Sequence, residues 1–569
     1  MTTDELTARV RAWIDQDPDP HTRAELEQLL AEDSPQAADE LADRFAGRLE
    51  FGTAGLRGAL GAGPNRMNRV VVGQAAAGLG AYLLSVRLPG PPADQSRPRV
   101  VVGYDARHNS EVFAQDTAAI LQGAGCEALL LPEALPTPVL AYAIRRLHCA
   151  AGVMVTASHN PPQDNGYKVY LGDGRQIAPP ADTAIATAIS AVGRADSLPR
   201  AEYRRLGGDL RAAYLREVLA LVPAGTRTLR LVHTSLHGVG GALVDDVLGG
   251  AGFVDRHLVA EQQRPDPDFP TVAFPNPEEP GAMDLALELA LRVDADLVLA
   301  NDPDADRCAV AVPLGEGGTG RSGQHWRMLT GDEVGVLLAD ALLSAGVGGT
   351  YATTIVSASL LARMAPDRGA TYAETLTGFK WLTRVDGLAY AYEEAQGYCV
   401  APDLVRDKDG ISALLLVCDL AERLHAESRS LLDRLDELAD EYGVHATDQL
   451  SVRVDDLSLI ADAMRRLRKA PPDTLGGLPV ERVDDLSEGI RDLPPTDGLR
   501  LHLSSGGRVV VRPSGTEPKL KCYLEVVVEV GSSRDADRTA AVEAARIAAA
   551  GRLDAIKADL SVALGIGSA

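Results

Sequence analysis

The sequence has little positive charge for its length. Of 569 residues, 56 are Lys or Arg and 80 are Asp or Glu, which gives a formal net charge of −24 at pH 7. A nucleic-acid interface needs a surplus of basic side chains, so we expect no nucleic-acid partner. The same charge disfavours an anionic membrane surface. It leaves room for a local basic pocket that binds a small anionic ligand.

Long apolar runs, aromatic residues and paired cysteines are also scarce. No run of 18 apolar residues occurs, so we expect no membrane-spanning helix, and the N-terminal stretch is too acidic for a secretory signal. Aromatic residues make up only 4% of the chain, so its cores must depend on Ala, Leu and Val. The six cysteines form no Cys-x-x-Cys pair. This excludes a zinc cluster of that type and favours reduced thiols in the cytoplasm.

What the chain does contain is a repeated strand-then-helix rhythm. Apolar runs typical of buried strands occur at 99–104, 127–131, 152–155, 229–234, 296–300, 353–356 and 389–392. Helical patterns separate them, as at 332–343 and 411–425. This alternation predicts parallel sheets that are covered by helices on both faces. The tail differs, because strand-like runs at 449–454, 499–503, 508–511 and 521–530 favour an antiparallel sheet, followed by an Ala-rich helix at 535–556.

We therefore predict an α/β protein with three consecutive α/β domains, whose sheets are parallel or mixed, and a C-terminal α+β domain. Domain I covers residues 1–205 and begins with an acidic helical extension over residues 2–47. Domains II, III and IV cover residues 206–320, 321–442 and 443–569. A chain of this length is ample for several domains and a large buried core.

The most informative stretch is 151–162, which reads Ala-Gly-Val-Met-Val-Thr-Ala-Ser-His-Asn-Pro-Pro. An apolar strand ends there in a polar loop that contains Ser158. In open α/β sheets, reactive groups lie on loops at the carboxyl ends of strands, and an activated serine can carry a covalent intermediate. The alternative is that Thr156 or Ser158 caps a following helix. A serine hydrolase is disfavoured, because the Gly-x-Ser-x-Gly elbow is absent.

A second stretch places three carboxylates at alternating positions after the apolar strand 297–300: Asp302, Asp304 and Asp306. Carboxylates this close repel one another unless a cation neutralises them, and their hard oxygens suit Mg²⁺ or Ca²⁺. An EF-hand is excluded, because Arg307 stands at the glycine position and Pro313 at the bidentate Glu position. A phosphatase with an aspartate nucleophile and a solvated acidic turn are the remaining alternatives.

Two weaker stretches could bind phosphate and sugar hydroxyls, respectively. In 512–519 an arginine, two hydroxyls, a glycine and a lysine can form a phosphate cradle, although a plain turn between strands is the alternative. The residues concerned are Arg512, Ser514, Gly515, Thr516 and Lys519. After the strand 389–392, the carboxylates of Glu393 and Glu394 could bind sugar hydroxyls, or form a surface turn. The glycines at 238–241 lack the dinucleotide-binding spacing and favour a helix N-terminus.

Together these motifs resemble the α-D-phosphohexomutases, which include phosphoglucomutases and phosphomannomutases. The resemblance rests on Thr156-Ala-Ser-His-Asn-Pro161 with Asn165-Gly-Tyr-Lys168, on the three aspartates followed by Arg307, on Glu394, and on Arg512-Pro-Ser-Gly-Thr516. Residues 51–58 and 377–380 are similar to two further active-site loops of that family. The helical lead-in and Glu-Glu-Ala-Gln-Gly-Tyr are most similar to its phosphoglucomutase-2/phosphopentomutase branch.

The resemblance implies four domains around a central cleft and a Ser158 that is phosphorylated in the active enzyme. One Mg²⁺ per active site would bind the phosphoserine together with Asp302, Asp304 and Asp306. Catalytic groups would be Ser158, Lys168, Arg57 and His159. The resemblance assigns substrate binding to Thr377, Gly378, Lys380, Glu393, Glu394, Gln396, Arg307, Arg512, Ser514, Gly515, Thr516 and Lys519.

Lys168 could accept a proton if burial beside other cations lowers its pKa. The sugar loop departs from the family pattern, because Gln396 replaces a serine and Tyr398 a histidine. This departure leaves open which sugar is preferred.

The implied activity is a phosphosugar mutase, with glucose 1-phosphate as the first expected substrate and a sugar bisphosphate as activator. Alternatives are phosphopentomutase or phosphomannomutase specificity, a phosphatase that uses Asp302 or Asp304 as nucleophile, and a noncatalytic sugar-phosphate sensor. We expect a cytoplasmic monomer or homodimer whose partner is a small-molecule sugar phosphate.

Overall fold

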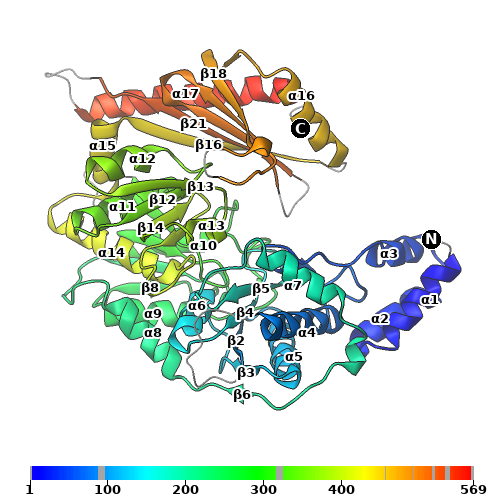
Figure 1. Ribbon diagram of the computed structural model, residues 1–569. Helices are drawn as coiled ribbons and strands as arrows, with labels where there is room; N and C mark the ends of the chain where they lie inside the picture. Colours follow the sequence, from blue (N-terminus) through cyan, green and yellow to red (C-terminus); the bar gives the residue numbers. More distant parts are fainter. Residues whose placement is uncertain are drawn as a thin grey trace. The chain divides into compact units, whose positions relative to one another are not determined.

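The computed structural model describes residues 3–86, 97–314, 325–454, 457–490, 493–514, 519–531 and 538–565 (Figure 1). The chain forms two compact units. Unit 1 comprises Met1–Leu329 and Gly397–Glu422, and unit 2 comprises Thr330–Gln396 and Arg423–Ala569. Strands of the described residues form four sheets, flanked by helices along most of the chain, which confirms the predicted α/β class. Within the described residues, no helix has the length and apolar character needed to cross a membrane.

Unit 1 begins with the predicted helical extension. Its helices are α1 (Thr3–Ile14), α2 (Pro20–Ala31) and α3 (Pro35–Arg44). Helices α2 and α3 each begin with a proline that follows a side-chain N-cap. Asp19 accepts from the backbone N–H of His21, and the Ser34 hydroxyl accepts from that of Ala37. The third helix ends at Arg44, a few residues earlier than the sequence pattern predicts.

The first sheet of unit 1 has the strand order β1-β5-β4-β2-β3-β6. Its strands are β1 (Leu56–Ala59), β2 (Arg99–Tyr104), β3 (Glu127–Leu130), β4 (Ala151–Val155), β5 (Asp164–Leu171) and β6 (Arg204–Arg205). Strands β3, β2 and β4 run parallel as predicted, whereas β5 returns antiparallel to β4 and pairs with β1. The sequence analysis did not predict β5. The connection from β4 is too short for a crossover helix, so the chain must return antiparallel.

Helices α5 (Ser110–Ala124) and α6 (Thr137–Arg146) pack against this sheet, and α4 (Arg69–Ser85) packs on α5 and on α7 (Ala181–Ser190). Helix α4 begins after Asn68, whose side chain accepts from the N–H of Val71. Helix α6 contacts both β2 and β4, the strand that leads to the serine loop.

The second sheet of unit 1 has the order β11-β10-β9-β7-β8. Its strands are β7 (Leu231–Thr234), β8 (Arg256–Leu258), β9 (Leu297–Ala300), β10 (Ala309–Leu314) and β11 (His325–Met328), with helices α8 (Asp209–Leu219), α9 (Gly241–Gly250) and α10 (Asp284–Val293). Strand β10 pairs antiparallel with β9, so the loop 301–308 joins the ends of two adjacent strands. This geometry holds the predicted acidic loop at one edge of the sheet.

Unit 2 contains the parallel strands β12 (Thr350–Thr354), β13 (Thr371–Thr375) and β14 (Leu388–Glu393), with α11 (Gly331–Ser344), α12 (Leu360–Asp367), α13 (Phe379–Leu382) and α15 (Leu431–Tyr442). Its other sheet is antiparallel, as predicted, in the order β16-β21-β20-β19-β18-β17. These strands are β16 (Val444–Arg453), β17 (Thr474–Leu475), β18 (Leu478–Asp485), β19 (Leu499–Leu503), β20 (Arg508–Pro513) and β21 (Lys519–Val528), with α16 (Leu457–Lys469) and α17 (Arg538–Leu564). Strand β15 (Gly397–Cys399) lies in the segment Gly397–Glu422 of unit 1, and so does most of helix α14 (Gly410–Ala426).

An ionic network joins the two sheets of unit 2. Arg508 of β20 pairs with Glu525 of β21 at 2.8 Å and with Glu374 of β13 at 3.0 Å. Glu525 also accepts from the backbone N–H of Ser359 at 2.7 Å. Removing one partner of such a buried set leaves a desolvated charge, so the network fixes the two sheets of unit 2 against each other.

The loop 51–58 supplies a stability test, because Gly55 has a φ of +78° and a Cβ there would lie 1.8 Å from the carbonyl oxygen of Tyr167. We predict that Gly55→Ala lowers the free energy of unfolding by about 1–3 kcal/mol. The matched control is Gly52→Ala, since a Cβ at Gly52 meets no atom within 4 Å. Urea titration of both variants measures the difference. Equal stability of the two variants would contradict the packing argument.

Candidate active site

Ser158 lies in the loop between β4 and β5 and is only 3% exposed. Its hydroxyl donates to Asp302 Oδ2 at 2.7 Å and lies 3.2 Å from His159 Nδ1. Its φ of +53° is left-handed, which is uncommon for a residue other than glycine. The Thr156 hydroxyl accepts from the Ser158 N–H at 2.8 Å. The helix-cap alternative is wrong, because the loop leads into strand β5.

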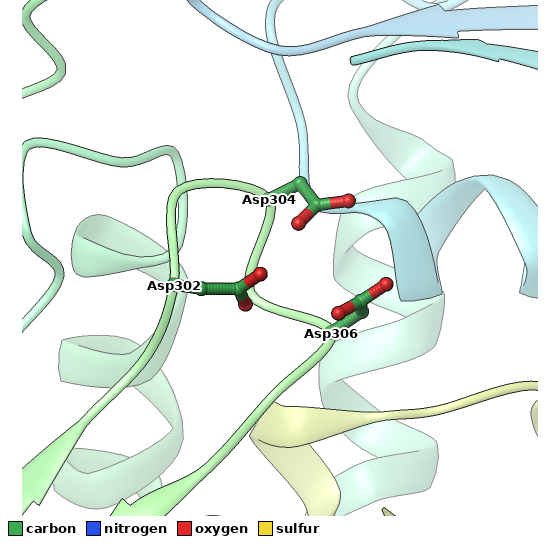
Figure 2. Close-up of side chains that lie close together, drawn as sticks. All are labelled: Asp302, Asp304 and Asp306. Atoms are coloured by element: carbon green, nitrogen blue, oxygen red, sulfur yellow. The ribbon is translucent and has the colours of Figure 1, made fainter. Parts of the chain in front are cut away.

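The three aspartates converge, with carboxylate oxygens within 4.8 Å of one another (Figure 2). All three side chains are buried, so the solvated-turn alternative is also wrong. Burial and the charges of Asp304 and Asp306 raise the pKa of Asp302 well above its ordinary value. One oxygen each of Asp304 and Asp306 is buried without a hydrogen-bond partner. These hard, unpaired oxygens fit a divalent cation.

Lys168 of β5 lies against the same loop. Its Nζ is 2.7 Å from Asp304 Oδ2 and 3.0 Å from Asp306 Oδ2. Burial lowers the pKa of Lys168, but Asp304 and Asp306 outweigh burial, so the net shift is upward. The expected lowering of this pKa is therefore wrong in this arrangement. The ammonium group acts here as a counter-charge to the carboxylates.

Two residues of this cluster were missed by the sequence analysis. Thr137, the first residue of α6, donates its hydroxyl to Asp304 Oδ2 at 2.6 Å, and its N–H donates to the Asp304 carbonyl at 2.9 Å. Lys408 lies with its Nζ 3.5 Å from Asp306 Oδ2. The only signal for Lys408 in the sequence is the charged run 406–409, directly before helix α14.

Further cationic side chains surround Ser158. The Arg57 guanidinium donates to Asn160 Oδ1 at 3.3 Å, and burial lowers the pKa of Arg57. Burial, with Arg307 and Arg57 nearby, lowers the pKa of His159 well below its ordinary value, so the imidazole is neutral at pH 7. The N–H of Arg307 donates to Asp302 Oδ1 at 3.0 Å. Unit 1 thus brings together all of its predicted site residues.

The predicted sugar loop lies in unit 2. Glu394 Oε2 accepts from the hydroxyls of Ser357 at 3.1 Å and Thr354 at 3.3 Å. A Cβ on Gly331 would lie 1.9 Å from the Glu394 carbonyl oxygen, so the loop packs directly on the start of α11. Burial and the charges of Glu393 and Asp332 raise the pKa of Glu394 to about 8. Gln396 is 4% exposed and left-handed, at φ +58°.

The remaining predicted residues also belong to unit 2. Thr377 and Gly378 precede the short helix α13, where Lys380 Nζ lies 5.8 Å from the centre of the Trp381 ring. Arg512 and Ser514 lie at the end of β20, and the Ser514 N–H donates to the carbonyl of Lys519 at 2.8 Å. Gly515 and Thr516 lie outside the described residues.

Tyr523 of β21 links the sugar loop and the phosphate loop. Burial raises the pKa of Tyr523; the charge of Glu394 raises it further, and Arg512 opposes the shift. Tyr523 therefore lies close enough to Glu394 and Arg512 for both charges to act on it.

The shifted pKa of Glu394 predicts a pH-dependent stability. The pKa of Glu394 is about 8 in the folded protein, against 4.5 for an ordinary Glu. The protonated carboxyl therefore stabilises the folded state fully below pH 4.5, and this stabilisation is lost as the pH rises to about 8. Between pH 5 and pH 8 we expect the free energy of unfolding to fall by about 1–3 kcal/mol less in Glu394→Gln than in the parent, because Gln cannot ionise. The exposed Glu488→Gln variant is the control in urea titrations. Parallel pH profiles for parent and Glu394→Gln would contradict this shift.

Comparison with known proteins places the chain. Four domain descriptions match in order: phosphoglucomutase/phosphomannomutase alpha/beta/alpha domains I, II and III over residues 48–195, 212–315 and 330–442, and the C-terminal domain over 450–546. A "Probable phosphomannomutase" of Haemophilus influenzae is 46% identical to this chain, and the alignment covers 84% of this chain and 96% of that protein. A Mus musculus phosphopentomutase is 34% identical over 93% and 91%.

A solved structure agrees in fold. It is a phosphoglucomutase/phosphomannomutase family protein from Burkholderia thailandensis, 20% identical, with a TM-score of 0.67 over 91% of this chain and 98% of that one. The matches follow one another along nearly the whole chain, and the relatives are mutases. The chain therefore belongs to the phosphoglucomutase/phosphomannomutase family of phosphosugar mutases.

Proposed function

We propose that this mutase interconverts sugar 1-phosphates with sugar 6-phosphates (or 5-phosphates) through a phosphorylated Ser158 and a bisphosphorylated sugar. The single observation that carries the proposal is the buried Ser158 hydroxyl bonded to Asp302, beside Lys168 and the acidic loop. Phosphoryl transfer depends on positioning and on neutralising charge, and this cluster supplies both.

In the proposed cycle, the bond between phosphorus and Ser158 Oγ breaks as a sugar hydroxyl oxygen forms a new bond to phosphorus. The hydroxyl proton leaves to a neighbouring base, and a sugar bisphosphate results. In the second transfer Ser158 Oγ, giving up its proton, forms a bond to the other phosphorus, the bond from that phosphorus to its sugar oxygen breaks, and the sugar oxygen takes up a proton as the isomer is released. Lys168, Arg57 and Arg307 neutralise the phosphoryl oxygens. The neutral imidazole of His159 lies within hydrogen-bond reach of the serine oxygen and can accept a proton there.

Asp302, Asp304 and Asp306 would hold one Mg²⁺ per active site, together with an oxygen of phosphorylated Ser158. The bound ion supplies charge neutralisation and orients the phosphoryl group. The two unpartnered carboxylate oxygens support this assignment. Lys408, which lies near Asp306, adds a further positive charge at the same carboxylates.

For the substrate, we propose glucose 1-phosphate first, ribose or deoxyribose 1-phosphate second and mannose 1-phosphate third. Glu394 would bind sugar hydroxyls together with Glu393 and Gln396, and Glu394 with Gln396 would decide among the sugars. Thr377, Gly378 and Lys380 would complete the sugar site. Arg512, Ser514, Gly515, Thr516 and Lys519 would bind the phosphate that is not transferred, since a guanidinium fork fits phosphate oxygens. A panel of hexose and pentose 1-phosphates with catalytic bisphosphate tests this order.

The setting of the enzyme is part of the same proposal. All six cysteines are buried free thiols, which supports a reducing, cytoplasmic compartment. We propose domain boundaries near residues 205, 320 and 442, a monomer or homodimer, and a sugar bisphosphate as the activator that first phosphorylates Ser158.

Phosphate mapping tests the role of Ser158. After incubation with glucose 1,6-bisphosphate, intact mass and peptide mapping should place one phosphate on Ser158, and Ser158→Ala should lose at least about 1,000-fold in kcat because the nucleophile is absent. Ser235→Ala is the control, because this buried serine also follows a strand but donates to the Gln262 carbonyl. Full mutase activity in Ser158→Ala would falsify the assignment.

Mg²⁺ binding has a readout that does not depend on turnover. Because a ligand bound only to the folded state stabilises it by about 2.7 kcal/mol at 100 times its Kd, MgCl₂ should raise the Tm of the parent protein. Asp304→Asn should lose most of that increment and most Mg²⁺-dependent activity. The exposed Asp268→Asn variant should keep both. An equal increment in Asp304→Asn and parent would remove Asp304 from the metal site.

A further inference from the structure

Arg107, which follows strand β2, holds the loop that carries Ser158. Its side chain is only 1% exposed. Its Nη1 donates to the carbonyl oxygens of Pro161 at 2.8 Å and Asp164 at 3.2 Å. Its Nη2 donates to the carbonyl oxygens of Ser158 at 2.6 Å and of Asn160. A single guanidinium thus donates hydrogen bonds to four backbone carbonyls of the segment 158–164.

The guanidinium is itself held from two other sides. Asp105 Oδ2 lies 3.4 Å from Arg107 Nε, and Asp105 Oδ1 accepts from the Arg107 N–H at 3.0 Å and from the Ser110 hydroxyl at 2.6 Å. The Phe269 ring lies 4.9 Å from the guanidinium carbon, in cation–π contact. Asp105 and Phe269 therefore leave Arg107 little freedom to move away from the loop.

This arrangement explains why Ser158 keeps a left-handed backbone. Such a conformation is strained and persists only where surrounding contacts impose it. With its own carbonyl bonded to Arg107 and its N–H to Thr156, Ser158 is fixed on both sides, which aims its hydroxyl at Asp302. Lysine could not replace the fork, because its three donors radiate from one point.

We propose that Arg107 is a positioning residue that sets the reactivity of Ser158 by fixing the conformation of its loop. This inference rests on the proposed function. The Arg107 guanidinium donates to backbone carbonyls of the loop and lies against Asp105 and Phe269, and among the described residues its hydrogen bonds do not include the serine hydroxyl. Its loss should therefore slow the phosphorylation of Ser158 and lower kcat, while KM for the sugar phosphate changes little.

The test compares Arg107→Ala and Arg107→Lys with Arg227→Ala. Arg227 is a matched control in unit 1: it is buried, lies 5.4 Å from the Phe253 ring and donates to the Pro223 carbonyl, remote in contacts from Ser158. We expect both Arg107 variants to be phosphorylated on Ser158 by glucose 1,6-bisphosphate about 100-fold more slowly, with KM within about threefold. Ethylguanidinium should restore part of the rate in Arg107→Ala, and ethylammonium should not.

Parent-like phosphorylation in Arg107→Ala would overturn the proposal. The proposal would also be overturned if Arg227→Ala lost as much phosphorylation rate as Arg107→Ala and ethylguanidinium did not rescue Arg107→Ala. That combination would indicate general destabilisation of the protein. Hydrogen exchange of the amides in 158–164 provides a second readout and should rise only in the Arg107 variants; unchanged exchange also overturns it. If the parent takes no phosphate on Ser158, the proposed function fails, and the exchange result still decides the role of Arg107.

Discussion

The site in unit 1 depends on the burial of three carboxyl groups at one point. Asp302, Asp304 and Asp306 lie together with almost no solvent contact, which is costly unless positive charge compensates them. Lys168 supplies part of that compensation from a different segment of the chain. The remaining unpaired oxygens mark where a cation would complete it. The aspartates also determine where the serine hydroxyl points, because Asp302 accepts its hydrogen bond.

Antiparallel strand returns bring these groups together. Strand β5 follows the serine loop and places Lys168 opposite Met154 of β4, while β10 follows the acidic loop and fixes both of its ends. A purely parallel sheet would require a long crossover after each loop and would separate Lys168 from Ser158. The two antiparallel strands β5 and β10 therefore help to bring the serine loop and the acidic loop into one cluster.

The sequence allowed much of the fold and the local motifs to be predicted. The strand 99–104 and the acidic loop are readable because an apolar run ends there in polar residues. Strand β5 was not predicted, because its mixed composition is typical of a loop and it is defined by its pairing with β4 and β1. Lys408 and Arg107 were not assigned a role, because each acts on a loop distant in sequence. The pKa of Lys168 was predicted in the wrong direction, because its carboxylate neighbours could not be anticipated.

One measurement tests the central claim most directly: the fate of the phosphoryl group in a single turnover. Protein carrying ³²P on Ser158 is mixed with unlabelled glucose 1-phosphate and Mg²⁺, and the products are separated after quenching at successive times. The account predicts that label passes from the protein to sugar bisphosphate and then to sugar 6-phosphate, before any inorganic phosphate appears. Release of label directly as inorganic phosphate, or its retention on the protein, would contradict a mutase that works through phosphorylated Ser158.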